Sequence, residues 1–284
     1  MTQENSCPPP DPTPVPPLPE GVTAHREVEY ARVDGHRLLL DLFLPRAPGP
    51  APVVVWVHGG GWRVGNKEAC PALYLAAAGF AIASIEYRLS DTQPFPAQIH
   101  DCKAAIRWLR AHADQYKLDG AHIGAYGCSA GGHLVALLGV SDDNAHLEGD
   151  VGGNLKFSSG VQAVCNCCGV SDLFDLAEAW RSTEYAPYLD AFLGGPIEEF
   201  KDKAAAASPL THIAPDAPPF YSLHGDKDEC VPVQQSVRLD EALRQAGADS
   251  TLEIIQGAGH GFGSPQIESD IRDFFQRTLM GPCR

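Results

Sequence analysis

The chain has 284 residues, of which 44% are hydrophobic and 20% charged, and its formal net charge is −15. This composition predicts a packed globular core and excludes a largely disordered chain. The strong negative charge disfavours nucleic acid and anionic membranes as partners. No run of 18 apolar residues occurs, so no transmembrane helix is expected.

Residues 1–20 are rich in proline and are expected to form an extended, poorly ordered lead-in to a domain at residues 21–284. They contain no charged segment followed by an apolar one, which a secretory signal requires. As written, the sequence favours a cytoplasmic location. A secreted or periplasmic protein whose signal has been removed is the alternative.

Short apolar runs alternate with helical patterns along the chain. An antiparallel entry hairpin is expected first, with strands at 28–32 and 37–44 around the turn Asp34-Gly35. Buried strands follow at 53–57, 81–87, 121–126, 161–165, 220–224 and 251–255. Helices are expected at 71–78, 95–113, 130–138, 233–246 and 267–279. The alternation predicts an α/β fold with a mainly parallel eight-stranded sheet and helices on both faces.

Between residues 172 and 209 the pattern weakens. Aromatic residues and an alanine run suggest short helices rather than strands. We interpret this span as a small helical insertion that covers the active site. It carries Trp180, Tyr185, Tyr188 and Phe192 among charged residues, a mixture that suits a cleft for a polar, sugar-like alcohol. The alternative is that these aromatic residues only pack the insertion onto the sheet.

The stretch around Ser129 carries the strongest chemical signal. A predicted strand, the pentapeptide Gly127-Cys128-Ser129-Ala130-Gly131 and a predicted helix follow one another. G-x-S-x-G in this context is typical of a nucleophile elbow, where a sharp turn exposes the serine oxygen at the edge of a sheet. The first N–H groups of the helix are available to a developing negative charge.

A serine nucleophile needs a base, and the base needs an orienting acid. Asp228 lies just after the strand at 220–224, and His260 lies in a glycine-rich loop after the last strand. The carboxyl ends of parallel strands share one edge of the sheet, so both loops should meet the elbow. The order serine, aspartate, histidine predicts a triad of Ser129, Asp228 and His260.

Other residues compete for these roles. His224 is the main rival base, although it closes a strand and is expected to help hold the turn. Asp226 is the main rival acid and Asp172 a weaker one, since it also follows a strand. His212 and His133 are expected to be structural.

The segment His58-Gly59-Gly60-Gly61-Trp62 directly follows a buried strand. Successive glycines allow backbone N–H groups to point into one small volume without obstruction by side chains. We expect an oxyanion hole with donors from Gly60, Gly61 and Ala130. His58 is expected to order the loop by hydrogen bonding.

Nine cysteines are present, so at least one is unpaired. Cys165, Cys167 and Cys168 lack the second ligand pair of a zinc site and are expected to be small buried residues. Cys70 and Cys102 are the best candidates for a disulfide, because Cys70 opens one predicted helix, Cys102 lies on the buried face of the next, and two such helices can pack side by side. The alternative is a reduced, buried pair.

The motifs HGGGW, GCSAGGHL, HGDKDECVP and GAGHGF together resemble the α/β-hydrolase superfamily, specifically carboxylesterases near the hormone-sensitive lipase group. The bacterial bifunctional acetylxylan and feruloyl esterase type is the more similar pattern, and the resemblance covers about residues 28–262. It implies Ser129 as nucleophile, Asp228 as acid and His260 as base, with oxyanion donors at 59–62 and Ala130. The segment 165–169 departs from the bulkier aromatic residues expected there, which leaves the acyl preference open.

The leading hypothesis is a serine ester hydrolase that forms an acyl-enzyme and needs no cofactor or metal. Its substrate would be a small-molecule or oligosaccharide ester with a short acyl group, acetyl or feruloyl by the resemblance. A monomer or small homo-oligomer is expected. A peptidase of the prolyl oligopeptidase kind and a non-catalytic binding protein are the alternatives.

Overall fold

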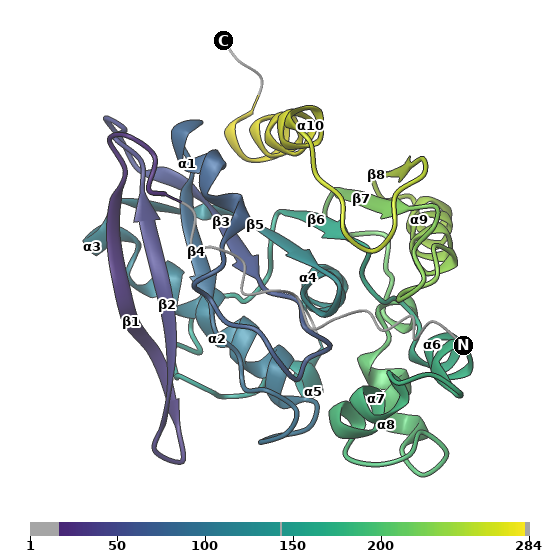
Figure 1. The fold of residues 1–284 in the computed structure, drawn as a ribbon. Helices are drawn as coiled ribbons and strands as arrows, with labels where there is room; N and C mark the ends of the chain where they lie inside the picture. The colour runs from purple at the N-terminus through teal and green to yellow at the C-terminus, as the bar shows by residue number, and fades with distance from the viewer. Residues whose placement is uncertain (1–16, 143, 282–284) are drawn as a thin grey trace.

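A computed structural model describes residues 17–142 and 144–281 (Figure 1). Residues 1–16 of the proline-rich segment, with Cys7, and residues 282–284, with Cys283, lie outside the described residues. The described chain forms one eight-stranded sheet in the order β1-β2-β4-β3-β5-β6-β7-β8. The strands are β1 (Thr23–Val33), β2 (His36–Leu44), β3 (Ala51–Val57), β4 (Ala81–Ile85), β5 (Leu118–Cys128), β6 (Ala163–Cys167), β7 (Phe220–Gly225) and β8 (Ser250–Ile255).

Strand β2 runs opposite to the other seven strands of the sheet. The hairpin of β1 and β2 is antiparallel, and β2 also pairs antiparallel with β4. Every pairing from β4 through β8 is parallel. The predicted mainly parallel sheet with an antiparallel entry hairpin is therefore confirmed.

Helices cover both faces of the sheet, as predicted (Figure 1). The helices are α1 (Tyr74–Ala77), α2 (Ala97–Ala111), α3 (Ala113–Tyr116), α4 (Ala130–Val140), α5 (Ala145–Glu148), α6 (Leu173–Trp180), α7 (Ala186–Leu193), α8 (Lys201–Ala207), α9 (Gln234–Ala246) and α10 (Pro265–Phe275). Short 3₁₀ turns occupy Pro71–Leu73 and Pro209–Thr211, and a π-helical turn at Gln276–Met280 follows α10. In the described residues no helix combines the length and the apolar character needed to cross a bilayer.

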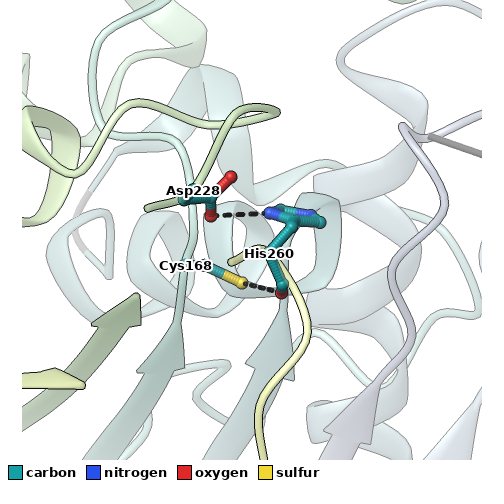
Figure 2. A group of neighbouring side chains, drawn as sticks. All are labelled: Cys168, Asp228 and His260. Carbon is teal, nitrogen blue, oxygen red and sulfur yellow. Dashed lines mark hydrogen bonds and ion pairs between the residues drawn. The ribbon is translucent and has the colours of Figure 1, made fainter. Parts of the chain in front are cut away.

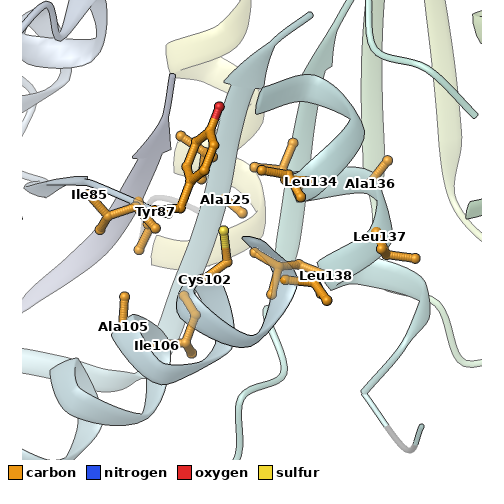
Figure 3. Packing of buried hydrophobic residues seen from close by; sticks show 14 of the residues in the cluster. Ile85, Tyr87, Cys102, Ala105, Ile106, Ala125, Leu134, Ala136, Leu137 and Leu138 are labelled. Atoms are coloured by element: carbon orange, nitrogen blue, oxygen red, sulfur yellow. The ribbon is translucent and has the colours of Figure 1, made fainter. Parts of the chain in front are cut away.

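The core has two layers because side chains of a strand alternate between its faces. Val53, Val55 and Val57 of β3 pack into a cluster with α2, α4 and α9. Val54 and Trp56 pack on the other face, with α1 and α10. Figure 3 shows the first layer, where α2 and α4 pack their apolar residues against the central strands.

Several predicted elements differ from the structure in their bounds, and two of them have a clear physical reason. The helix predicted at 95–113 ends at Ala111, and a separate turn, α3, follows a break at His112. The strand predicted at 161–165 is β6, two residues later, because Ala163 is the first residue to pair with β5. Apolar character alone does not show where pairing begins.

The disulfide prediction is wrong. Cys70 and Cys102 are both free and buried. Cys102, on α2, belongs to the first core layer, and Cys70 belongs to the second. The sheet separates the two thiols, so the alternative of reduced, buried residues holds.

Candidate active site

Ser129 sits at the sharp turn between β5 and α4. Its backbone angles are φ 57° and ψ −123°, a conformation that non-glycine residues rarely adopt. Its N–H donates to the carbonyl of Cys167 at the end of β6, at 2.8 Å. The strained turn is the geometry expected of a nucleophile elbow.

The structure brings the three predicted triad residues together. His260 Nδ1 lies 2.7 Å from Asp228 Oδ2, and His260 Nε2 lies 2.9 Å from Ser129 Oγ. The Asp228 carboxylate can only accept, so Nδ1 carries a proton. In the neutral imidazole the lone pair of Nε2 then faces the serine hydroxyl. This is the tautomer that a general base needs.

Asp228 is held by the loop around it and by two histidines. Its Oδ1 accepts the backbone N–H groups of Cys230 and Val231, each at 2.8 Å, and its side chain is fully buried. Burial alone raises the pKa of a carboxyl group, but hydrogen bonds from His224 and His260 outweigh it and hold the pKa of Asp228 well below its usual range. The group is therefore ionised at neutral pH.

The contact with Asp228 also shifts the pKa of His260. Burial lowers the pKa of the imidazole, but the hydrogen bond to Asp228 outweighs this effect and raises the pKa above its ordinary value of 6.5. The side chain of His260 is 22% exposed, whereas that of Asp228 is fully buried.

The rival residues hold structural positions. His224 is buried, with Nδ1 2.7 Å from the hydroxyl of Ser236 and Nε2 2.9 Å from the carbonyl of Val231. The same Nε2 lies 3.1 Å from Asp228 Oδ2, so His224 holds the acid rather than replacing the base. Asp226 accepts the N–H of Gly257.

The two remaining rivals lie elsewhere. Asp172 caps the start of α6 by accepting the N–H groups of Phe174 and Asp175. His212 Nε2 lies 2.8 Å from the carbonyl of Ala206. Both therefore stabilise the insertion.

The glycine loop runs beside the nucleophile. A Cβ on Gly59 would lie 2.8 Å from the carbonyl of Cys128 and 3.3 Å from Cβ of Ser129. Gly60 has φ 110°, a region that side chains disfavour. The predicted donors Gly60, Gly61 and Ala130 thus lie on two segments in close contact around Ser129, and their role as an oxyanion hole stays a prediction.

His58 orders the start of this loop. Its Nδ1 lies 2.8 Å from the carbonyl of Gly59, and its ring stacks on Tyr87 with centroids 4.3 Å apart. The hydroxyl of Tyr87 donates to the carbonyl of His58 at 3.0 Å. Burial lowers the pKa of His58 to about 4, so its imidazole is neutral and fixed. The hydrogen bonding predicted for His58 is present.

The insertion packs on both loops of the site. A Cβ on Gly61 would lie 2.5 Å from the ring of Tyr188 on α7, and the guanidinium of Arg63 lies 5.3 Å from that ring. On α6, the indole N–H of Trp180 donates to the carbonyl of Cys230 at 2.7 Å, two residues beyond Asp228. The sequence pointed to both aromatic residues, but their contacts could not be assigned from it.

Cys168 is a neighbour of the triad that the sequence did not reveal. Its thiol donates to the backbone carbonyl of His260 at 3.5 Å (Figure 2). Possible ligand atoms of Cys168, Asp228 and His260 all lie within 4.8 Å of one another. Because Nδ1 of His260 carries the proton shared with Asp228, a cation could bind there only by displacing that proton.

A cavity of about 770 Å³ lies away from these residues. It is lined by the end of α4 and by residues 161–162 and 217–219, which precede β6 and β7. It therefore opens at the amino ends of the parallel strands, whereas the triad loops follow their carboxyl ends.

Comparison with known proteins finds a matching family model and a relative named as an esterase. The BD-FAE family model matches residues 40–243. The esterase LipC of Mycobacterium tuberculosis is 33% identical over 264 residues, which cover 89% of this chain and 64% of LipC. The chain thus spans less than two thirds of the length of this relative.

Solved structures are similar over nearly the whole chain. A truncated carbohydrate esterase from gut microbiota superposes with a TM-score of 0.81 at 32% identity, covering 91% of this chain and 96% of that one. The propionate-bound esterase Est2 of Thermogutta terrifontis superposes with a TM-score of 0.73 at 28% identity, covering 94% and 97%. The matched family model and the doubly covered, mostly parallel sheet lead to one assignment: the chain belongs to the BD-FAE family of α/β-hydrolases.

Proposed function

We propose that the protein is a serine carboxylesterase that works through a covalent acyl-enzyme. The observation that carries this proposal is the continuous chain from Asp228 through His260 to Ser129, with contacts of 2.7 and 2.9 Å. Both hydrogen bonds have the polarity that draws a proton from the serine toward the imidazole.

In the first half-reaction Ser129 Oγ attacks the ester carbonyl while Nε2 of His260 accepts its proton. The Asp228 carboxylate stabilises the imidazolium that forms. The N–H groups of Gly60, Gly61 and Ala130 would receive the negative charge on the carbonyl oxygen. His260 then protonates the departing alcohol, and water repeats the sequence to release the acid. None of these steps draws on a cofactor or metal.

For the substrate we propose short acyl esters of polar, sugar-like alcohols, such as acetyl or feruloyl esters of plant polysaccharide fragments. Tyr188 and Arg63 lie against the glycine loop and offer an aromatic face beside a charge. The names of the similar structures, a carbohydrate esterase and an esterase with propionate bound, are consistent with this class.

Fluorophosphonate labelling tests the catalytic part of the proposal. The probe should modify one serine, and peptide mapping should locate it at Ser129. A binding protein with an inert site would show no labelling. Hydrolysis of an ester but not of the matching amide then separates an esterase from a peptidase.

A panel of p-nitrophenyl esters tests the acyl preference. Each methylene that fits a pocket contributes about 0.8 kcal/mol by burial, so a drop in kcat/KM beyond butyrate would mark the end of the pocket. Release of acetate from acetylated xylan, or of ferulate from methyl ferulate, tests the alcohol. Best activity on octanoate or longer esters would overturn the substrate proposal but not the catalytic mechanism.

Treatment with EDTA should leave every hydrolysis rate unchanged. A loss of activity that a divalent metal restores would contradict the metal-free mechanism.

A further inference from the structure

Trp62 connects the glycine loop to the helix that carries the nucleophile. It follows Gly61 directly, has φ 59° and is 1% exposed. Its indole Nε1–H donates to Nδ1 of His133 at 3.0 Å. His133 lies on α4, one helical turn beyond Ser129, and is fully buried.

The hydrogen bonds fix one neutral form of His133. An indole nitrogen can only donate, so Nδ1 of the imidazole must accept. Nε2 lies 2.7 Å from the carbonyl of Ala207 and must therefore carry the proton. Burial lowers the pKa of His133 to about 4, which keeps the ring neutral in the range where an esterase acts.

The side chain of Trp62 is fixed on its other sides as well. It stacks on Phe192 of α7, with ring centroids 4.3 Å apart and planes at 25°. It also meets the ring of His133 edge to face at 5.2 Å. Its carbonyl accepts the N–H of Ser90 at 2.8 Å. These contacts hold Trp62, the residue next to Gly61, in place.

We propose that His133 and Trp62 are positioning residues that set the distance between the two halves of the oxyanion hole. This inference rests on the proposed esterase function. The N–H groups of Gly60 and Gly61 belong to the loop after β3, whereas that of Ala130 belongs to the first turn of α4. Donors aimed at one oxygen must be held to within about 0.5 Å, and glycines have no side chain that could hold them.

The indole–imidazole hydrogen bond supplies the missing side-chain link. It joins the residue after the glycines to the helix whose first N–H is the third donor. The bond to Ala207 extends the link to α8, so the insertion supports the same geometry.

The test removes the hydrogen bond with the least change in packing. Trp62→Phe keeps an aromatic ring on Phe192 but has no N–H. His133→Leu removes the acceptor, and His133→Gln retains an acceptor and a donor. Tyr30→Phe is the matched control, because its hydroxyl donates to the carbonyl of Glu86 at 2.6 Å in an equally buried place on β1. Active sites are counted by fluorophosphonate titration, so that kcat refers to folded enzyme.

We expect Trp62→Phe and His133→Leu each to lower kcat per titrated site by about 10- to 100-fold, since losing one donor outright costs about 10²–10³-fold. KM should change less than about twofold, because the loss falls on the transition state. The preference for an oxoester over the matching thionoester should fall, since the larger sulfur tests how well the donors fit an oxygen anion. His133→Gln should restore most of the kcat and most of the oxoester preference that His133→Leu loses. The double variant Trp62→Phe/His133→Leu should have a kcat no lower than that of the poorer single variant.

An unchanged kcat per site, or an unchanged oxoester preference, in Trp62→Phe would overturn the inference and leave these residues as packing only. The inference also fails if Tyr30→Phe loses as much kcat. Should the wild-type protein neither label nor hydrolyse esters, the proposed function itself fails, which is a different result. His133→Gln and Trp62→Phe keep the test decisive if His133→Leu does not fold.

Discussion

Asp228 receives hydrogen bonds from two histidines and two backbone N–H groups. In asparagine the amide oxygen takes the place of Oδ1, which accepts the N–H groups of Cys230 and Val231, so the amide N–H faces Nδ1 of His260. A donor there cannot replace the carboxylate acceptor, and His260 loses its orientation and tautomer. We predict that Asp228→Asn lowers kcat by about 10⁴-fold. Asp226→Asn is the matched control, since Asp226 accepts only the N–H of Gly257 among the bonds described for it and its amide oxygen can still do so. A larger loss in Asp226→Asn would show that the wrong acid has been assigned.

Ser129→Ala should abolish ester turnover without changing the fold. Nucleophile and base act as a unit, so the expected loss is about 10⁴-fold or more. Steady-state hydrolysis of p-nitrophenyl acetate measures it, with circular dichroism to check folding. Cys128→Ser, one residue earlier, should retain activity because only the backbone of the elbow is required there. A Ser129→Ala protein with a tenth of wild-type activity would rule out the assigned nucleophile.

The pH profile should report His260. The base must be neutral to accept a proton, and the Asp228 carboxylate raises its pKa above 6.5. Activity is therefore lost as pH falls through that raised value, so the midpoint of kcat/KM should lie above pH 6.5. Asp228, whose pKa is held well below its usual range, is ionised throughout and adds no second limb near its ordinary pKa of 3.8. Measurement with a neutral ester would contradict this account if the midpoint fell below 6.5.

At the scale of elements, the proposed sugar-binding role of the insertion formed by α6, α7 and α8 can be tested. Tyr188→Ala removes the ring beside Gly61. A stacked aromatic face contributes about 0.5–1.5 kcal/mol, so kcat/KM for an acetylated xylo-oligosaccharide should fall by about 2- to 10-fold. Ethyl acetate, which has no sugar to stack, should change less. Phe174→Ala, at an exposed residue of α6, is the control, and equal losses on both esters would refute a sugar-binding role.

Helices and strands could be predicted where the hydrophobic pattern fits only one type of secondary structure. The run 53–57 could only be a buried strand, and the glycines around Ser129 permit a sharp turn. The break at His112 was not visible, since the apolar spacing continues across it. The disulfide prediction failed because adjacency along the chain does not show on which face of the sheet a helix packs.

At the scale of the whole molecule, the triad could be predicted because chain order and strand ends restrict where its members lie. The hydrogen bonds of the residues around the site could not be predicted. Trp62 and His133 are 71 residues apart, and His133 and Ala207 are 74 apart. Sequence alone gives no period or motif that joins them. The pairing of β3 with β5 brings the loop of Trp62 beside α4, and α8 of the insertion brings Ala207 to His133. His224 was likewise expected to hold a turn, but its contact with Asp228 emerges only in the folded chain.

The position of β8 at the edge of the sheet leads to an expectation about which part of the molecule unfolds first. β8 ends the sheet and pairs with β7 alone, most of its residues are only partly buried, and His260 follows it. Edge segments with few buried contacts open at a lower free energy than the core. In rising urea, hydrolysis should therefore disappear before the circular dichroism of the sheet changes, and coincident transitions would contradict this. Ser129 and His260 are 131 residues apart, so a growing chain becomes active only when its last strand has docked.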